Sequence, residues 1–390
     1  MGTVIPRKVW HPSVTTQFRI CPIPFHFDTY RGCKYGCLFC FARDITEFER
    51  RNKQQEERRQ SYLVGCSPQG LERWVNRVLK SDYNYKNAAM VAFKERIPIK
   101  IGATADPFPI VESKERITYE CLKIFDKHDY PVQISTKNPE VFLGYADEFV
   151  NSNIAFNVSC SFCDDDVARK IEIGAPPPSR RFAAIRKLAD MGYKVTVRIQ
   201  PFILPYSEQV AERFIKTIKD CGAWAFQTEG LKLRVAMPKK EKEIYKKIGD
   251  VFGFDILSEF KLKGVVEQGD RVYSIADKKA MLTLYTELAE KYGIRFLNAD
   301  NYIREGFGCG AECCGTEFLR NHKIWGGCLR TKILGNGGIE ESAELGKCYA
   351  NFLRNTNNYK RTIGEMSEEF CENELKRMKN SYTQLTFDFD

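Results

Sequence analysis

The feature that most constrains the fold is a regular alternation of short apolar runs with longer helical patterns. The apolar runs are rich in β-branched and aromatic residues, as buried parallel strands are, and they cover residues 25–30, 97–103, 131–136, 154–159, 194–200 and 224–229. Helical patterns separate them at about 69–80, 114–127, 179–191 and 207–221. Six β/α units in series predict an α/β fold, a partial parallel (β/α)6 barrel.

The pattern changes after the sixth run, and this change suggests three regions. Residues 1–24 are expected to be an N-terminal extension, and 25–300 the barrel with a helical insert that begins at 239–247 and a further strand at 294–297. Residues 301–390 are rich in glycine and cysteine and end in helical patterns at 340–353 and 364–379. We expect this mainly helical C-terminal extension to pack on the barrel mouth.

Composition fits a folded protein of the reducing cytoplasm. The 390 residues are 43% hydrophobic, enough for a sizeable core. The apolar runs are too short to span a bilayer, and the N-terminus has no apolar signal segment. Fifteen cysteines in such a chain indicate metal ligands or catalytic groups more than disulfides. The formal charge of +9 suits an anionic partner, but it is a mild excess.

Three cysteines follow the first predicted strand, where a parallel barrel carries its chemistry. Cys33, Cys37 and Cys40 form a CxxxCxxC triplet, and Gly32 and Gly36 permit a tight backbone path around a bound group. Four thiolates usually hold a 4Fe-4S cluster, so three would leave one iron with an open coordination site. The alternatives are a zinc loop, which needs a fourth ligand, or three incidental thiols.

This triplet, with Tyr30-Arg31-Gly32 before it and Phe41-Ala42-Arg43 after it, resembles the radical S-adenosylmethionine (SAM) superfamily. Segments 102–107, 134–137, 157–159 and 175–181 resemble the group related to spore photoproduct lyase. The resemblance implies a radical SAM barrel in which the open iron binds SAM and the reduced cluster cleaves it. A 5′-deoxyadenosyl radical would then abstract hydrogen from the substrate. A reductant such as flavodoxin or ferredoxin would supply the electron.

The same resemblance suggests cofactor-binding residues at the strand ends. Lys137 and Ser159 would contact the carboxylate of SAM, and Arg198 could add positive charge there. Asp106 would hydrogen-bond adenosine or fix the loop after the second strand. A solvated lysine and a helix-capping serine are the structural alternatives. No residue is assigned as the catalytic hydrogen donor.

A second group of cysteines lies in the C-terminal region. Cys309, Cys313, Cys314 and Cys328 supply four thiols, the number that closes a zinc site or an auxiliary iron–sulfur cluster. Because adjacent cysteines reach one ion with difficulty, Cys348 is a possible replacement ligand. The remaining alternative is a set of reduced structural thiols.

The resemblance and the positive charge favour a nucleic acid or nucleotide base as substrate, repaired or modified by a reaction of lyase or transferase type. Residues 384–389 also resemble the peptide with which DNA-processing proteins bind a sliding clamp, although a frayed tail is the plainer interpretation. The rival hypotheses are a radical SAM enzyme acting on a peptide or small metabolite, and a noncatalytic iron–sulfur or zinc module.

Overall fold

A curved eight-stranded sheet organises the chain. The computed structural model describes residues 5–15, 20–42, 63–267, 270–300, 303, 306–310 and 312–348. The strands lie in the order β2-β3-β6-β7-β8-β9-β10-β14. Their bounds are Ser13–Val14 (β2), Phe25–Phe27 (β3), Ile99–Ile101 (β6), Val132–Thr136 (β7), Ile154–Ser159 (β8), Val195–Phe202 (β9), Ala225–Gly230 (β10) and Arg295–Asn298 (β14).

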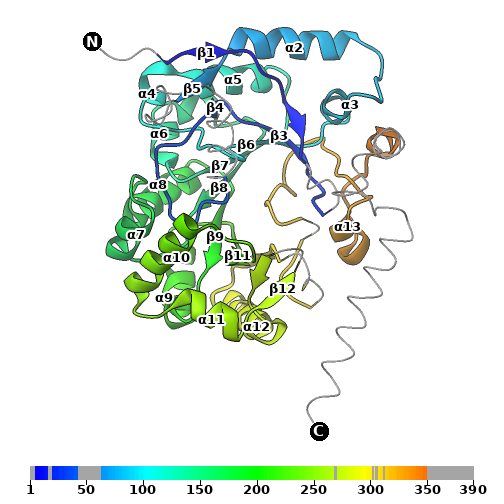
Figure 1. The fold of residues 1–390 in the computed structure, drawn as a ribbon. Helices are drawn as coiled ribbons and strands as arrows, with labels where there is room; N and C mark the ends of the chain where they lie inside the picture. The colour runs from blue at the N-terminus through cyan, green and yellow to red at the C-terminus, as the bar shows by residue number, and fades with distance from the viewer. Residues whose placement is uncertain are drawn as a thin grey trace.

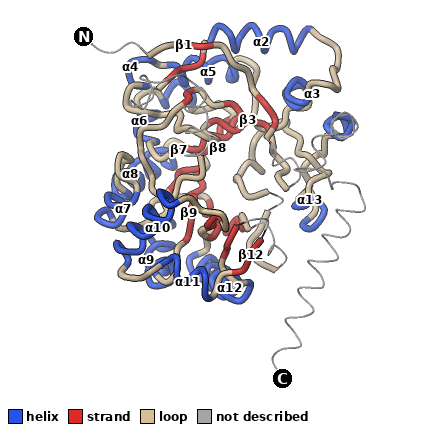
Figure 2. Tube along the Cα trace, in the orientation of Figure 1, coloured by secondary structure: helices blue, strands red, loops and turns tan. Residues whose placement is uncertain are grey.

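All neighbouring pairs from β3 to β14 are parallel, and only the edge strand β2 is antiparallel to its neighbour. The helices lie mostly on one side of the sheet, whereas the C-terminal region lies on the other, inner side (Figures 1 and 2). Parallel strands need helical crossovers, which explains this one-sided cover. The partial barrel predicted from the sequence is therefore confirmed, with a seventh parallel strand, β14.

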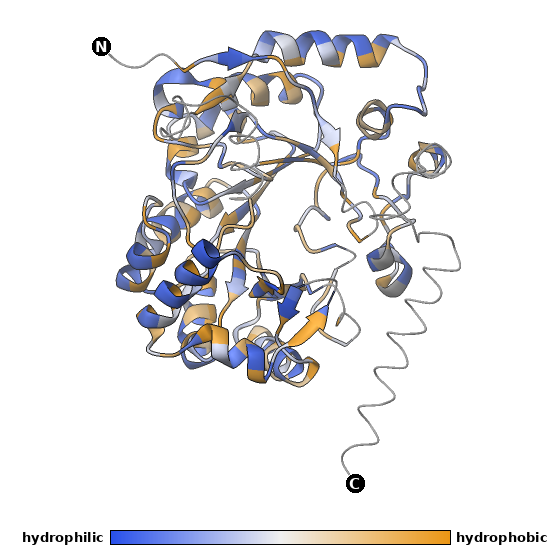
Figure 3. Cartoon of the chain, viewed as in Figure 1, coloured by the Kyte–Doolittle hydropathy of each residue, from blue (hydrophilic) through white to orange (hydrophobic). Residues whose placement is uncertain are grey.

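The outer helices bury one face each against the sheet. Phe142 of α6, for example, packs edge-on against Phe156 of β8 with ring centres 4.8 Å apart. Figure 3 shows hydrophilic and hydrophobic residues together on these helices, as expected for helices with one face on a core. The helices are Pro68–Lys80 (α2), Ala88–Lys94 (α3), Glu112–Glu115 (α4), Ile117–Asp126 (α5), Pro139–Leu143 (α6), Asp165–Ile171 (α7), Pro178–Asp190 (α8), Tyr206–Asp220 (α9), Lys239–Phe252 (α10), Ile256–Leu262 (α11), Ile275–Tyr292 (α12) and Leu329–Leu334 (α13), with a 3-10 turn at Ala146–Phe149.

The structure differs from the sequence-based expectation in two places. The helix expected over 114–127 is two helices, because Arg116 has a φ of 50° and breaks the helical path between α4 and α5. The insert is not purely helical, since β11 (Lys232–Arg234), β12 (Val265–Glu267) and β13 (Asp270–Val272) form a separate antiparallel sheet. The patterns expected at 364–379 and 384–389 lie outside the described residues.

The N-terminal segment also joins the fold. Its strand β1 (Arg7–Lys8) pairs with β5 (Val64–Cys66), and β5 pairs with β4 (Tyr30–Arg31), which leads into the cysteine triplet. Residues 1–24 are thus an extension that contributes β1 to this small sheet and β2 to the main one.

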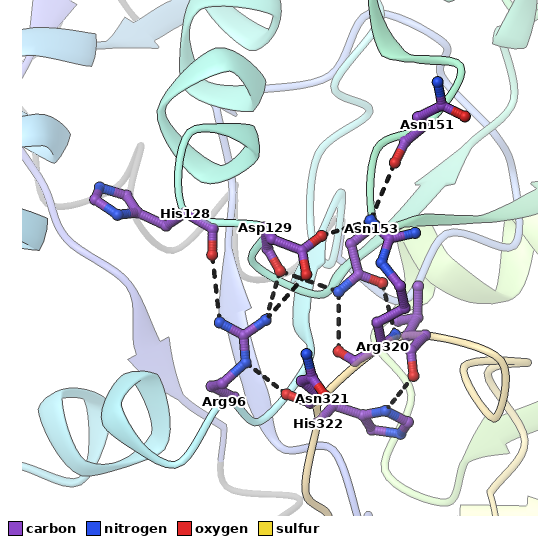
Figure 4. Close-up of polar contacts among 9 residues, drawn as sticks. Arg96, His128, Asp129, Asn151, Asn153, Arg320, Asn321 and His322 are labelled. Carbon is purple, nitrogen blue, oxygen red and sulfur yellow. Dashed lines mark hydrogen bonds and ion pairs between the residues drawn. The ribbon is translucent and has the colours of Figure 1, made fainter.

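One described part of the C-terminal region lies away from the mouth of the barrel. Residues 319–322 bind the chain just before β6, β7 and β8, at the amino-terminal edge of the sheet (Figure 4). Asn153 accepts a hydrogen bond from the backbone N–H of Arg320 at 2.8 Å and donates to its carbonyl oxygen at 3.0 Å. The Arg320 guanidinium bonds Asp129, and that of Arg96 bonds the Asn321 carbonyl.

Glycine permits the rest of this segment to press on the inner face of the sheet. Gly315 has a φ of 67°, and a Cβ there would lie 2.3 Å from the Thr196 hydroxyl of β9. The Cys309 N–H donates to the Phe296 carbonyl of β14, the edge strand of the sheet, at 2.7 Å. A larger side chain at Gly315 would therefore collide with β9.

Replacing Asn153 by alanine should therefore loosen the C-terminal segment. The buried Asn153 side chain makes three hydrogen bonds, two to Arg320 and one to the Asp129 carbonyl. Leaving those backbone groups unpaired should cost about 2 kcal/mol in unfolding by urea and speed hydrogen exchange at residues 319–322. Asn151→Ala is the matched control, because Asn151 bonds Arg320 only through its carbonyl. Equal exchange in both variants would contradict the role given to Asn153.

Among the helices of the described residues, none combines the length and apolarity needed to cross a membrane.

Candidate active site

The cysteine triplet occupies a loop at the carboxyl-terminal edge of the sheet. The loop follows β4, whose Tyr30 hydroxyl donates to the buried Glu112 carboxylate at 2.5 Å. Gly32 and Gly36 have φ angles of 85° and 60°, which residues with a Cβ adopt rarely. The loop after α7 holds it from the side, because the Gly174 N–H donates to the Tyr35 carbonyl at 2.8 Å.

The three thiols lie near one another and are half-buried. Burial raises the pKa of Cys33, and backbone N–H groups of Tyr35 and Asp106 that donate to its sulfur oppose this rise. Burial also raises the pKa of Cys37 to about 12, although Lys137 opposes it. Metal binding must displace these protons, and N–H donors together with a nearby cation favour the thiolate that results.

This donor set fits a three-thiolate cluster. The thiols come from one short loop and influence each other's charge, and Cys33 already receives the N–H hydrogen bonds that cluster sulfurs typically accept. Across the described stretches, no three His, Cys, Asp or Glu side chains approach closely enough to enclose a metal ion. The ligand roles of Cys33, Cys37 and Cys40 therefore remain a prediction.

Lys137 lies beside this loop, held by a buried ion-pair network. Its ammonium is 3.4 Å from a carboxylate oxygen of Glu172 and 5.6 Å from the ring centre of Phe39, between the second and third cysteines. Glu172 is fully buried and also pairs with the fully buried Arg181 at 2.6 Å. Burial alone would raise the pKa of Glu172 and lower that of Lys137. For Glu172 the charges of Arg181 and Lys137 outweigh burial, so its pKa is lowered. For Lys137 the influence of Cys37 and Glu172 outweighs burial, so its pKa is raised.

Arg181 ties three elements together. It donates to the Ser159 carbonyl at the end of β8 and to the Pro176 carbonyl, both at 2.7 Å, in addition to its pair with Glu172 after α7. A planar guanidinium can make the two hydrogen bonds and the ion pair at once, which a lysine could not. Arg181 therefore fixes the loop that supports the cysteine triplet.

Lys137, Ser159 and Arg198 lie at one level of the sheet. Thr136 pairs with Val158, so Lys137 comes level with Ser159, which pairs with Arg198 on β9. Arg198 donates to the side chain of Gln200. The fold thus brings these three predicted residues to adjacent strands, while Lys137 already has Glu172 as a partner. Their contact with SAM stays a prediction.

Asp106 fixes the loop after β6. Its carboxylate accepts from the Lys137 N–H at 2.6 Å, the Thr136 hydroxyl at 2.8 Å and the Phe108 N–H at 2.9 Å. Burial raises its pKa, and these bonds oppose the rise. With three donors engaged, the geometry favours the loop-fixing alternative over a bond to adenosine.

The second group of cysteines is spread over different surroundings. Cys309 is exposed near Arg295 and Glu317, and the buried Cys328 lies 3.2 Å from the Thr331 hydroxyl. The thiols of Cys313 and Cys314 are hydrogen-bonded to each other, and both lie near Lys100 on β6. Within the described residues these thiols form no metal-binding group, and neither do they with the buried Cys348. An auxiliary cluster or zinc ion here remains a prediction.

Sequence reasoning missed the position of Lys100. Its ammonium lies 3.1 Å from the sulfur of Cys21 and near Cys313 and Cys314, so the N-terminal extension and the C-terminal region meet on β6. The Asn157 amide nitrogen donates to the Cys314 carbonyl at 3.0 Å. Burial lowers the pKa of Lys100, but the three thiols outweigh it and raise the pKa. Cys21 stands alone in the sequence, so no cysteine spacing predicted its contact with Lys100.

Comparison with known families agrees with this arrangement. The model of the Radical SAM superfamily matches residues 28–218, which run from the cysteine loop through α9. Residues 28–218 therefore form a domain of the radical SAM superfamily. This confirms the family and the fold expected from the sequence, and membership of the domain in this family implies a 4Fe-4S cluster and SAM as cofactors. Enzymatic activity of the whole protein stays a prediction.

Three curated relatives are uncharacterized proteins of Mycobacterium bovis and of two strains of Mycobacterium tuberculosis, each 24% identical over 227 residues. The match covers 54% of this chain and 60% of each relative, so it spans less than two thirds of their length.

Among solved structures, spore photoproduct lyase complexed with dinucleoside spore photoproduct is similar at a TM-score of 0.48 and 14% identity, over 72% of this chain and 78% of that one. SuiB of Streptococcus suis bound to S-adenosylmethionine is similar at a TM-score of 0.43 and 12% identity, over 72% and 51%.

Proposed function

We propose that this enzyme uses Cys33, Cys37 and Cys40 to hold a 4Fe-4S cluster and abstracts hydrogen from a nucleic acid or nucleotide base. The observation that carries the proposal is the meeting of the cysteine loop with Lys137 at the carboxyl-terminal edge of the sheet. The cluster would supply the electron that cleaves SAM. Lys137, Ser159 and Arg198 would bind the carboxylate of SAM and fix its orientation.

Positive charge near the cysteine loop favours an anionic substrate. Arg198 adds a positive charge near the cofactor side, and the whole chain carries +9. This combination suits a phosphate-bearing substrate better than an apolar one.

The test is anaerobic reconstitution, reduction and addition of SAM, followed by measurement of 5′-deoxyadenosine with and without DNA, RNA or nucleotides. A nucleic acid substrate should stimulate its formation and should bind less tightly as salt rises, because phosphate contacts release counterions. Stimulation by peptides or small metabolites alone, with no nucleic acid binding at low salt, would replace the nucleotide proposal by its rival. No 5′-deoxyadenosine from an intact cluster would refute both.

A further inference from the structure

A lysine and three thiols meet on the inner side of the sheet, in a place that the proposed function does not use. The Lys100 ammonium lies 3.1 Å from the sulfur of Cys21, and Cys313 and Cys314 lie near it. Lysines in protein interiors usually pair with carboxylates. Among the described residues, however, Lys100 forms no salt bridge, and the titratable groups that attract its charge are these three thiols. This unusual pairing brings an amine and a sulfur into direct contact.

The backbone holds both partners in place. Lys100 is the middle residue of β6, which is paired with β3 on one side and β7 on the other. Cys21 precedes Pro22, whose carbonyl accepts a hydrogen bond from the Trp325 N–H at 2.7 Å. Because neither backbone segment is free to move away, the nitrogen and the sulfur stay close, and a reaction that joins them needs little rearrangement.

Partial burial selects the oxidant that reaches this pair. Cys21 is buried, whereas Lys100 and Cys313 each keep part of their surface exposed. A small, uncharged molecule such as molecular oxygen can therefore approach, but a bulky disulfide reagent cannot. The ammonium next to the sulfur favours a thiolate, which is the form of cysteine that oxidants attack.

We propose that Lys100 and Cys21 form a modification site, where molecular oxygen joins the amine and the thiol in a covalent N–O–S bridge. An ammonium–thiolate pair and one oxygen molecule give one bridge and one water. The N–O and O–S bonds form and the O–O bond breaks. Nitrogen and sulfur together lose the four electrons that the oxygen molecule gains. The second oxygen atom leaves as water with the two protons that the ammonium loses.

The bridge changes the inner side of the sheet in two ways. It ties the N-terminal extension to β6, and it removes the positive charge of Lys100 from the interior. Because the Trp325 N–H binds the carbonyl of Pro22, next to Cys21, the bridge also secures the C-terminal region. Excess small-molecule thiol reverses the step by returning the four electrons, which restores the amine and the thiol and releases water. The bridge is independent of the proposed cluster.

The experiment is peptide mass spectrometry of the reconstituted full chain, half of it kept anaerobic and half exposed to air. Free thiols are alkylated, and trypsin is used without reductant. In the air sample, peptide 20–31 should be joined to peptide 97–114, in which the modified Lys100 is not cleaved. The mass should equal the sum of both peptides plus one oxygen atom minus two hydrogen atoms. Dithiothreitol should remove the linkage, and the anaerobic sample should give separate peptides 97–100 and 101–114.

Variants test the two partners separately. Cys21→Ser and Lys100→Arg should abolish the linked peptide, and the second of them keeps the positive charge. Cys221→Ser is the matched control and should leave the linkage unchanged, because the buried Cys221 thiol donates to the Ile218 carbonyl and contacts no lysine. Air should also slow hydrogen exchange at Trp325 in the wild type but not in Cys21→Ser.

The mass and the partner peptide decide between the outcomes. A disulfide from Cys21 to Cys313 or Cys314, or a direct sulfur–nitrogen bond, would lack the oxygen atom and would overturn the proposal. A free Cys21 thiol after exposure of the wild type to air would do the same. The triple alanine variant of the cysteine triplet should form the same bridge. Its loss there would assign the oxidation to cluster iron and contradict a direct reaction with oxygen.

Discussion

Replacing Cys33, Cys37 and Cys40 together by alanine is expected to remove all SAM cleavage. Without thiolates the loop has no strong iron ligand, and neither Lys137 nor the backbone N–H groups at Cys33 can substitute, because both are donors. Reconstituted iron should fall by about four atoms per chain, the content of a 4Fe-4S cluster, and 5′-deoxyadenosine should become undetectable.

Cys163→Ala is the matched control for this variant. Cys163 is half-buried, follows β8 and contacts Tyr206 and Arg213 rather than the triplet. It should keep the iron and the activity of the wild type. Iron retained in the triple variant would place a second cluster at Cys309, Cys313, Cys314 or Cys328. Retained SAM cleavage would contradict the assignment of the triplet itself.

Arg181→Met should give the largest loss of stability among charge-removing substitutions near the site. It leaves the fully buried Glu172 with only the longer pair to Lys137, and it removes the donor to the carbonyls of Ser159 and Pro176. Breaking a buried pair from one side typically costs about 3–5 kcal/mol. Urea unfolding of the apoprotein would measure the change without any contribution from the cofactors.

The neighbouring residue provides the control. Arg180 pairs with Glu140 at 2.5 Å, but both side chains are largely exposed, so Arg180→Met should cost less than about 1 kcal/mol. The double variant Glu172→Gln/Arg181→Met removes both buried charges and should recover part of the loss. If Arg180→Met and Arg181→Met are equally stable, the buried network contributes nothing.

Acid should weaken the ion-pair network of Glu172, Arg181 and Lys137. The pKa of Glu172 is held below its ordinary value of 4.5, so the stability it contributes is complete above that value and is lost as pH falls through the lower, folded-state pKa. Below about pH 4.5 the wild type should therefore lose stability more steeply than Arg181→Met, in which the pKa of Glu172 is less depressed.

The sheet could be predicted because each strand carries its own signal. The run at 154–159 coincides with β8, and the others differ by a few residues at their ends, since apolar runs in a parallel sheet are buried on both faces whatever their neighbours are. The triplet was recognisable for a similar reason, because its three ligands lie within eight residues.

The supporting residues could not be predicted, because their roles depend on contacts between distant segments. Glu172 reads as an ordinary charged residue at a helix end, yet the packing of Gly174 against Tyr35 and the pairing with Arg181 bury it completely. Strands β11 to β13 have three residues each, too few to show alternation. The position of the C-terminal segment likewise depends on Asn153, more than 160 residues earlier.

The place of residues 308–322 has a consequence for the order in which the protein assembles during translation. The ribosome completes every strand of the main sheet before it makes the segment that covers the inner side of that sheet. A nascent chain that ends at β14 therefore holds Lys100, Asn157 and Thr196 in water. Because these side chains are polar, the unfinished interior offers little apolar surface for aggregation while the last part of the chain emerges.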